Sequence, residues 1–104
     1  MKVENMTNDS GRVIANQFIV WSDGGINYRT RTGERMRSQR GRMFQSYRTN
    51  IAFITLNGSV FLDERSWDYS RTTGKYRNLF LGESKKETEK KIKSGEYKLV
   101  NLNE

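Results

Sequence analysis

The residues of this 104-residue chain best suited to chemistry are the arginines between Arg29 and Arg42. Residues 28–43 contain six arginines and one acid, Glu34, and so carry five of the seven units of net positive charge. Residues 83–98 carry the other two, and the remainder is neutral. Guanidinium groups fit phosphate and carboxylate oxygens, and localised positive charge indicates an anionic partner better than uniform charge does. We therefore expect this segment to bind a polyanion.

The expected partner is a nucleic acid, either DNA or RNA, contacted by the arginines and by an aromatic ring that stacks on bases. A host or phage protein with an acidic surface is the alternative, and a solvated segment without a partner is the third reading. The predicted contact residues are Tyr28, Arg29, Arg31, Arg35, Arg37, Arg40, Arg42 and Arg48.

Three carboxylates, Asp63, Glu64 and Asp68, form a cluster in the sequence that suggests metal chemistry. Grouped carboxylates can hold Mg²⁺ for phosphoryl transfer, which would make the protein a nuclease. Acids also commonly end strands, and Arg65 and Arg71 are near enough in sequence to pair with these three. We keep the nuclease as a weak alternative and expect a non-enzymatic protein with no cofactor, no metal and no catalytic residue.

Cysteine and histidine are absent from the sequence. This excludes disulfides, Cys/His zinc sites, thiol nucleophiles and histidine-based triads. There is no apolar run near 18 residues, so we expect no membrane contact by a spanning helix. The N-terminal residues lack the apolar core of a signal peptide, and we expect a cytoplasmic location.

The first half of the chain predicts strands. Residues 12–21 (RVIANQFIVW) are rich in β-branched and aromatic residues with apolar groups on both faces, which predicts a central strand. The Asp-Gly-Gly at residues 23–25 predicts a hairpin into residues 26–32. If the chain then turns at Gly33-Glu34, a three-residue loop would place Arg31 opposite Arg37 in a basic ribbon.

The middle of the chain contains a second hairpin signal, Asn57-Gly58, between predicted strands at residues 51–56 and 59–63. Phe44 and Tyr47 are expected on a strand that precedes it. Trp67, Tyr69 and Tyr76 are expected in the core, because large aromatic residues are more often core than ligand platforms.

Two helices are expected near the C-terminus. Ser84 and Glu87 form the pattern of a capping box and Gly95 is a helix stop, so residues 84–94 predict a polar surface helix. Residues 66–82 fit either a hairpin or a helix, and we favour a helix from about Thr73. A last strand is expected at residues 97–102.

These elements predict an α+β fold: a small antiparallel sheet of about five strands, one or two helices and a projecting basic β-ribbon arm. We expect a single domain over residues 1–104, with a flexible lead-in at 1–11 and the Arg-rich arm at 27–43. Exposed sheet edges and a ribbon are common pairing devices, which leaves a homo-oligomer open.

Three stretches, FQSYRTNIAFITLNGSVFLD, WDYSRTTGKYRNLFLGE and ETEKKIKSGEYKLVNLN, resemble an uncharacterised family of small phage-encoded proteins, a domain of unknown function. The resemblance runs from about Arg12 to the C-terminus. It implies phage origin and a life in the cytoplasm of an infected bacterium, and it implies no activity. Members pass from the Asp-Gly-Gly turn to the FQSY motif within a few residues, so residues 27–43 resemble an insertion. A phage protein of this kind suggests a second hypothesis, an anti-defence or host-takeover inhibitor such as an anti-CRISPR protein.

Overall fold

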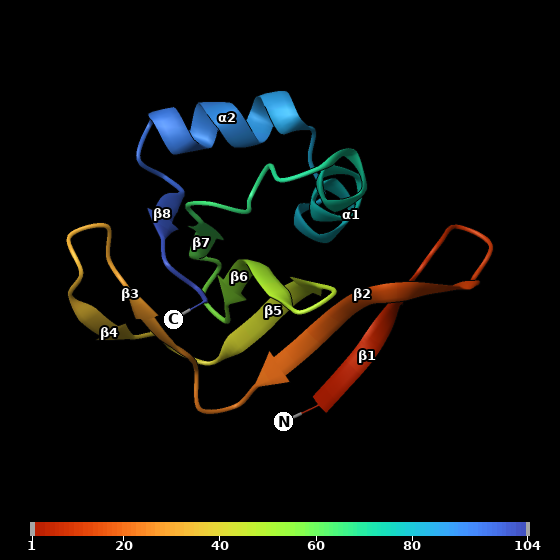
Figure 1. Ribbon diagram of the computed structural model, residues 1–104, viewed down its shortest axis with the longest axis horizontal. Helices are drawn as coiled ribbons and strands as arrows, with labels where there is room; N and C mark the ends of the chain where they lie inside the picture. The colour runs from red at the N-terminus through yellow and green to blue at the C-terminus, as the bar shows by residue number, and fades with distance from the viewer. Residues whose placement is uncertain (1, 104) are drawn as a thin grey trace.

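The computed structural model, which describes residues 2–103, has a mixed six-stranded sheet with two helices on one face (Figure 1). The order across the sheet is β1-β2-β5-β6-β7-β8. These strands are β1 (Lys2–Thr7), β2 (Val13–Ser22), β5 (Gly41–Ser46), β6 (Thr49–Thr55), β7 (Val60–Asp63) and β8 (Lys98–Val100). The predicted α+β class is confirmed, although the strands are more numerous than the expected five.

The Asn57-Gly58 hairpin is confirmed as the connection between β6 and β7. Gly58 has a φ of 91°, a conformation that glycine adopts without steric cost. The β6–β7 pair is antiparallel, with Phe53 opposite Phe61, whereas β7 and β8 are parallel. A parallel pair needs a long crossover, and the two helices provide it.

The hairpin predicted at residues 23–25 is wrong. The chain reverses there, but β2 pairs with β1 and β5 instead of with the next segment. Turn chemistry determines where a chain reverses and does not determine which strands then pair. Both edges of the ten-residue β2 are taken by longer partners than the three residues of β3 (Asn27–Arg29) could offer.

The expected lead-in at residues 1–11 is also different in the structure, because Lys2–Thr7 form the edge strand β1. Its polar side chains gave little strand signal. Pairing with β2 and burial of one side chain, Met6, compensate for that low propensity.

Both predicted helices are present: α1 (Arg71–Leu81) and α2 (Lys85–Lys93). Ser70 caps α1, and Gly82 ends it in the left-handed conformation. The capping box between Ser84 and Glu87 is formed as the sequence predicted. Neither helix in residues 2–103 is long and apolar enough to cross a membrane.

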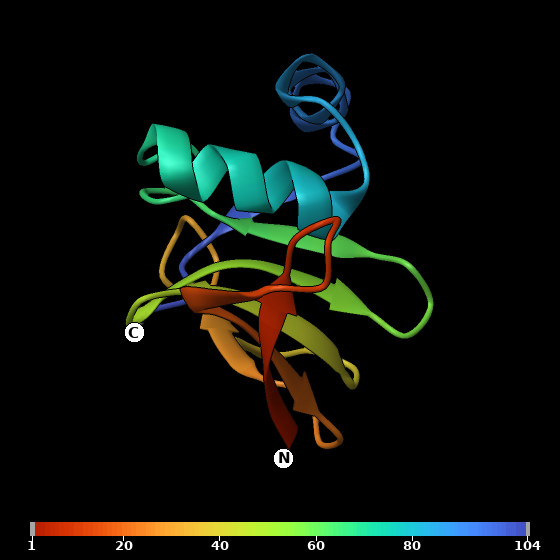
Figure 2. The same cartoon turned by 90° about the vertical axis from the view of Figure 1, so that its right-hand side faces the viewer.

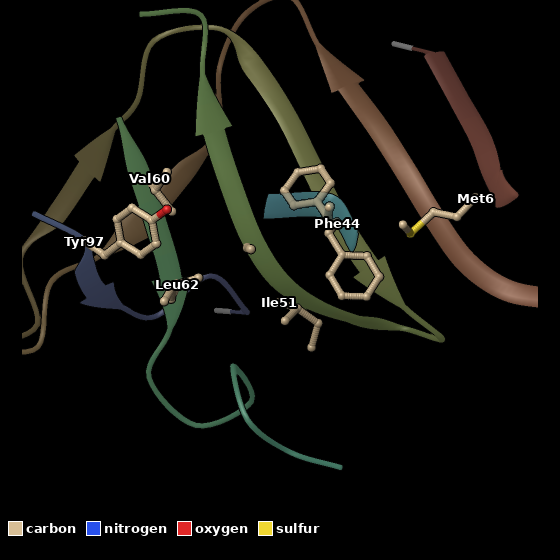
Figure 3. Close-up of a cluster of buried hydrophobic side chains, with 8 residues drawn as sticks. Met6, Phe44, Ile51, Val60, Leu62 and Tyr97 are labelled. Atoms are coloured by element: carbon tan, nitrogen blue, oxygen red, sulfur yellow. The ribbon is translucent and has the colours of Figure 1, made fainter. Parts of the chain in front are cut away.

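The helices cover one face of the sheet, and Figure 2 shows them above the strands. A core cluster lies between the two layers, with the rings of Phe44 and Phe80 5.8 Å apart between centroids (Figure 3). A second cluster lies on the opposite face and includes Tyr28, Phe53 and Leu102. Both faces of the central strands are therefore buried.

Candidate nucleic-acid interface

The predicted basic ribbon exists as a separate two-stranded sheet of β3 and β4 (Arg35–Arg37). The predicted register is wrong: Arg29 lies opposite Arg35, and Arg37 lies opposite Asn27. The turn is centred earlier in the sequence than expected, because the backbone N–H of Thr30 donates to the carbonyl of Glu34 at 2.9 Å and closes the loop at residues 31–33. Two arginines still face each other across the strands, which disfavours the ribbon by a few tenths of a kcal/mol.

The ribbon is anchored to the body of the protein and does not project freely. The ring centroid of Tyr28 lies 4.8 Å from that of Phe61 in β7. The backbones of Arg29 and Asn101 exchange two hydrogen bonds, of 3.0 and 2.7 Å. Tyr28 is only 8% exposed, so its predicted role in base stacking is wrong and its role is to hold the ribbon in place.

Three arginines share the outer face of the ribbon. Successive side chains of a strand point to opposite sides, so Arg29, Arg35 and Arg37 lie on the side away from the buried Tyr28. Two of their side chains bond neutral oxygens, and Arg29 donates to the carbonyl of Gly33 at 3.0 Å. Arg37 donates to the side-chain oxygen of Asn27 at 3.0 Å and to the carbonyl of Gly24 at 2.6 Å. These bonds orient the guanidinium group and leave its charge uncompensated.

The two neighbouring arginines extend the basic surface. Arg31, in the ribbon loop, is 68% exposed and its Nε lies 3.8 Å from a carboxylate oxygen of Glu64. At that distance and exposure the ion pair contributes little stability. Arg40, just before β5, is exposed.

Arg42 and Arg48 do not belong to this surface. Arg42 lies over the rings of Trp21 and Phe80, at 5.7 and 5.6 Å, and Phe80 belongs to a helix on the other face of the sheet. Arg48 lies in the β5–β6 turn and lines a separate hollow with Arg65. In the sequence, these two are grouped with the ribbon arginines by charge alone. Charge does not reveal which face of a strand a side chain occupies, or that a residue lies in a distant turn.

A hollow of about 650 Å³ adjoins the ribbon. It is lined by the turn at residues 22–27, by Arg37, and from below by Met43, Asn50 and Leu102. Arg37, one of the three arginines on the outer face of the ribbon, therefore lies beside a concave surface.

The carboxylate cluster is not assembled in the structure. Asp63 is 3% exposed, and its two oxygens accept backbone N–H groups from Leu102 at 3.0 Å and Ser66 at 2.9 Å. Glu64 faces Arg31. Residues 2–103 contain no group of three acidic side chains placed to hold a metal, so the weak metal alternative at Asp63, Glu64 and Asp68 is not supported.

Asp68 is instead part of an ion-pair network. Its carboxylate lies 2.7 Å from the Lys85 ammonium group and 3.3 Å from the Arg77 guanidinium. Burial acts to raise the pKa of Asp68, but the hydrogen bonds and charges of these two cations outweigh it, and the pKa is lowered. A carboxylate held in this way has a structural role.

The sequence reading also missed a pair of exposed aromatics. Tyr69 was expected in the core and is 76% exposed, and Tyr47 is 60% exposed. Trp67 and Tyr76 do pack against the core. The sequence feature that could have indicated their exposure is the number of serine and threonine residues around both tyrosines, in FQSYRTN and SWDYSRTT.

Comparison with known proteins gives one result. No curated protein and no solved structure matches the chain. The Family of unknown function (DUF8033) matches residues 1–96, and the match includes the ribbon, the sheet from β1 to β7 and both helices. The chain therefore belongs to this family of unknown function.

Proposed function

We propose that the protein binds nucleic acid, DNA or RNA, through the outer face of the β3–β4 ribbon, without catalysing a reaction. The observation that carries the proposal is the grouping of Arg29, Arg35 and Arg37 on one anchored face, where no carboxylate of residues 2–103 pairs with Arg35 or Arg37. A phosphate that lies over the ribbon would be compensated by the guanidinium groups of Arg35 and Arg37. A two-stranded ribbon also has the dimensions to enter a nucleic-acid groove.

The anchoring supports binding in a second way. Because Tyr28 and the Arg29–Asn101 backbone pair already hold the ribbon, little conformational entropy is lost on binding. Arg31 and Arg40 extend the same basic surface and would contact further phosphates. The cytoplasm of a phage-infected bacterium, which the sequence resemblance implies, would supply both kinds of nucleic acid.

The test measures affinity for a DNA duplex, a DNA single strand and RNA at several salt concentrations. The variant carries Arg29, Arg35 and Arg37→Gln. Each phosphate contact contributes about 0.9 to the log–log salt slope on duplex DNA, so we expect the slope to fall in magnitude by about 2–3.

A matched control removes three charges elsewhere, with Lys86, Lys90 and Lys93→Gln on the exposed side of α2. We expect this control to keep most of the wild-type slope. Equal losses in both variants, or no salt-dependent binding by the wild type, would show that the ribbon is not a nucleic-acid interface.

An acidic protein surface is the second candidate partner, as for an inhibitor of a host defence protein. The observation that favours it is the pairing of Arg31 with the carboxylate of Glu64, since the ribbon loop already faces a carboxylate within its own chain. A pull-down from nuclease-treated bacterial lysate tests it. A stoichiometric protein partner that the triple ribbon variant fails to retain would support this candidate over nucleic acid.

A further inference from the structure

A second hollow, of about 380 Å³, lies between the β5–β6 turn and the start of α1. Its nine lining residues come from two stretches, 46–51 and 66–73. Eight of them carry a hydroxyl group, none is charged, and the ninth is Ile51. Both stretches belong to the motifs on which the family resemblance rests, and neither contributes to the ribbon.

Tyr47 lines this hollow in a strained conformation. Its φ is 55°, in the left-handed region that bulky residues rarely adopt. The backbone is fixed there, because its N–H donates to the carbonyl of Asn16 at 2.7 Å and its carbonyl accepts from the side chain of Gln45 at 2.8 Å. The ring gains little from burial, since it is 60% exposed. The two-residue turn between the paired residues Ser46 and Thr49 requires this conformation, so the turn holds the ring in solvent at the edge of the hollow.

Tyr69 lines the same hollow from the segment before α1. It is the most exposed large hydrophobic residue among residues 2–103, at 76%. Two tyrosine rings that remain in solvent beside one concavity offer flat apolar surfaces with polar tips.

The hydroxyl groups of the hollow are available to a ligand. Those of five lining residues make no hydrogen bond to any residue between 2 and 103: Tyr47, Thr49, Ser66, Tyr69 and Thr72. Three others form a chain in which the exposed Ser70 donates to the buried Thr73 at 3.1 Å and Thr73 donates to the buried Ser46 at 3.5 Å. No residue in the described range accepts the proton of Ser46, so the chain ends in a free donor.

The charge of the hollow restricts the class of ligand. Arg48 and Arg71 follow two of the lining residues directly, but each lines an adjoining hollow and not this one. An uncharged wall offers nothing to compensate a phosphate or a carboxylate. Hydroxyl groups both donate and accept, as do the hydroxyls of a sugar, and the apolar C–H face of a sugar ring packs on an aromatic ring.

We propose that this hollow binds a neutral saccharide, with Tyr47 and Tyr69 packing against the sugar ring and the Ser46 hydroxyl and its neighbours bonding the sugar hydroxyls. The site is independent of the ribbon and uses none of its arginines. A volume of about 380 Å³ lies at the small end of ligand pockets, which suits a mono- or disaccharide.

The test is an NMR titration of the ¹⁵N-labelled full chain with glucose, galactose, mannose, N-acetylglucosamine, maltose and lactose. At least one sugar should shift amide signals that cluster within residues 46–51 and 66–73. Adenosine, uridine and inorganic phosphate are titrated in parallel. Clustered shifts with a nucleoside or phosphate and none with a sugar would overturn the proposal, as would no clustered shift with any sugar at millimolar concentration.

Two variants separate binding from folding. Tyr47→Gly removes the ring and suits the positive φ, so the fold should be retained, as the unperturbed remainder of the spectrum would show. The Kd for the sugar should rise at least about tenfold, which corresponds to a loss of 1.4 kcal/mol. Tyr69→Ala should weaken binding similarly, whereas Leu56→Ala, at an exposed position outside the hollow, should not. An unchanged Kd in both tyrosine variants would overturn the proposal.

Discussion

The phenolic group of Tyr97 donates a hydrogen bond of 2.7 Å to the carboxylate of Glu83, and this contact joins the chain before β8 to the α1–α2 connection. The Glu83 side chain is 5% exposed and also accepts from Lys91 at 2.8 Å and from the Thr88 hydroxyl at 2.5 Å. Four polar side chains thus satisfy one another beneath α2, a helix with few apolar residues. This network attaches α2 together with Ile92, which packs against the core cluster.

Replacing Glu83 with Gln should destabilise the protein, because the half-buried Lys91 ammonium then faces a neutral amide. We expect the free energy of unfolding at neutral pH to fall by about 1–3 kcal/mol. Urea unfolding followed by tryptophan fluorescence measures it. Glu89→Gln, an exposed carboxylate on the same helix, is the control and should change stability by less than about 0.5 kcal/mol. Equal stability of the two variants would contradict this role.

The same carboxylate should make stability depend on acid pH. Burial acts to raise the pKa of Glu83, but hydrogen bonds from Lys91, Thr88 and Tyr97 outweigh it and lower the pKa below the ordinary 4.5. A lowered folded-state pKa gives stability that is present above about 4.5 and lost as pH falls through the folded pKa. Unfolding midpoints measured from pH 7 to pH 3 should therefore converge for the wild type and Glu83→Gln at the acid end.

Tyr97 should titrate above the ordinary range of a tyrosine. Burial and the adjacent Glu83 carboxylate raise its pKa to about 12 from the ordinary 10.0. Its contribution to stability is complete below pH 10 and is lost as pH rises towards 12. A spectrophotometric phenolate titration should show a late component that Tyr97→Phe abolishes. A late component that survives in Tyr97→Phe would assign it to another tyrosine.

Arg77 is a buried cation whose replacement should be severe. It is 1% exposed, donates to the carbonyl of Trp67 at 2.6 Å, and lies 5.2 Å from the centre of that indole ring. Arg77→Lys keeps the charge and loses the planar fork, so it should cost about 2–3 kcal/mol in urea unfolding. Arg71→Lys on the exposed side of α1 is the matched control and should be near neutral.

Two Gly→Ala substitutions should have opposite signs. A Cβ at Gly41 would lie 2.1 Å from the carbonyl oxygen of Ile54 in the paired strand, so Gly41→Ala must separate β5 from β6 and should cost at least about 2 kcal/mol. A Cβ at Gly74 in α1 would meet only ordinary contacts, the nearest at 3.7 Å. Gly74→Ala should therefore stabilise the protein by about 0.5–1 kcal/mol through helix propensity. Thermal unfolding of both variants checks the signs, and a stabilising Gly41→Ala would contradict the strand spacing.

Elements with a local chemical cause were predictable. The capping box of Ser84 and Glu87, the Asn57-Gly58 turn and the β-branched and aromatic run that forms β2 each act within a few residues, and the structure contains all three. The carboxylates could not be assigned in this way. Asp63 accepts a backbone N–H from Leu102, which lies 39 residues later in the chain. Only the tertiary structure shows that this segment lies beside Asp63, so the sequence could not distinguish this role from metal binding.

The sequence by itself determined that most of the excess charge lies in one short segment, that Cys and His chemistry is absent, and that one polar helix precedes the last strand. Only the tertiary structure decided that Tyr28 anchors the ribbon, that Arg42 points to the helix face, and that Tyr47 and Tyr69 share a hollow. The physical reason is that charge and capping are properties of neighbouring residues. Strand partners and side-chain exposure depend instead on which distant segments compete for the same edge or face of the sheet.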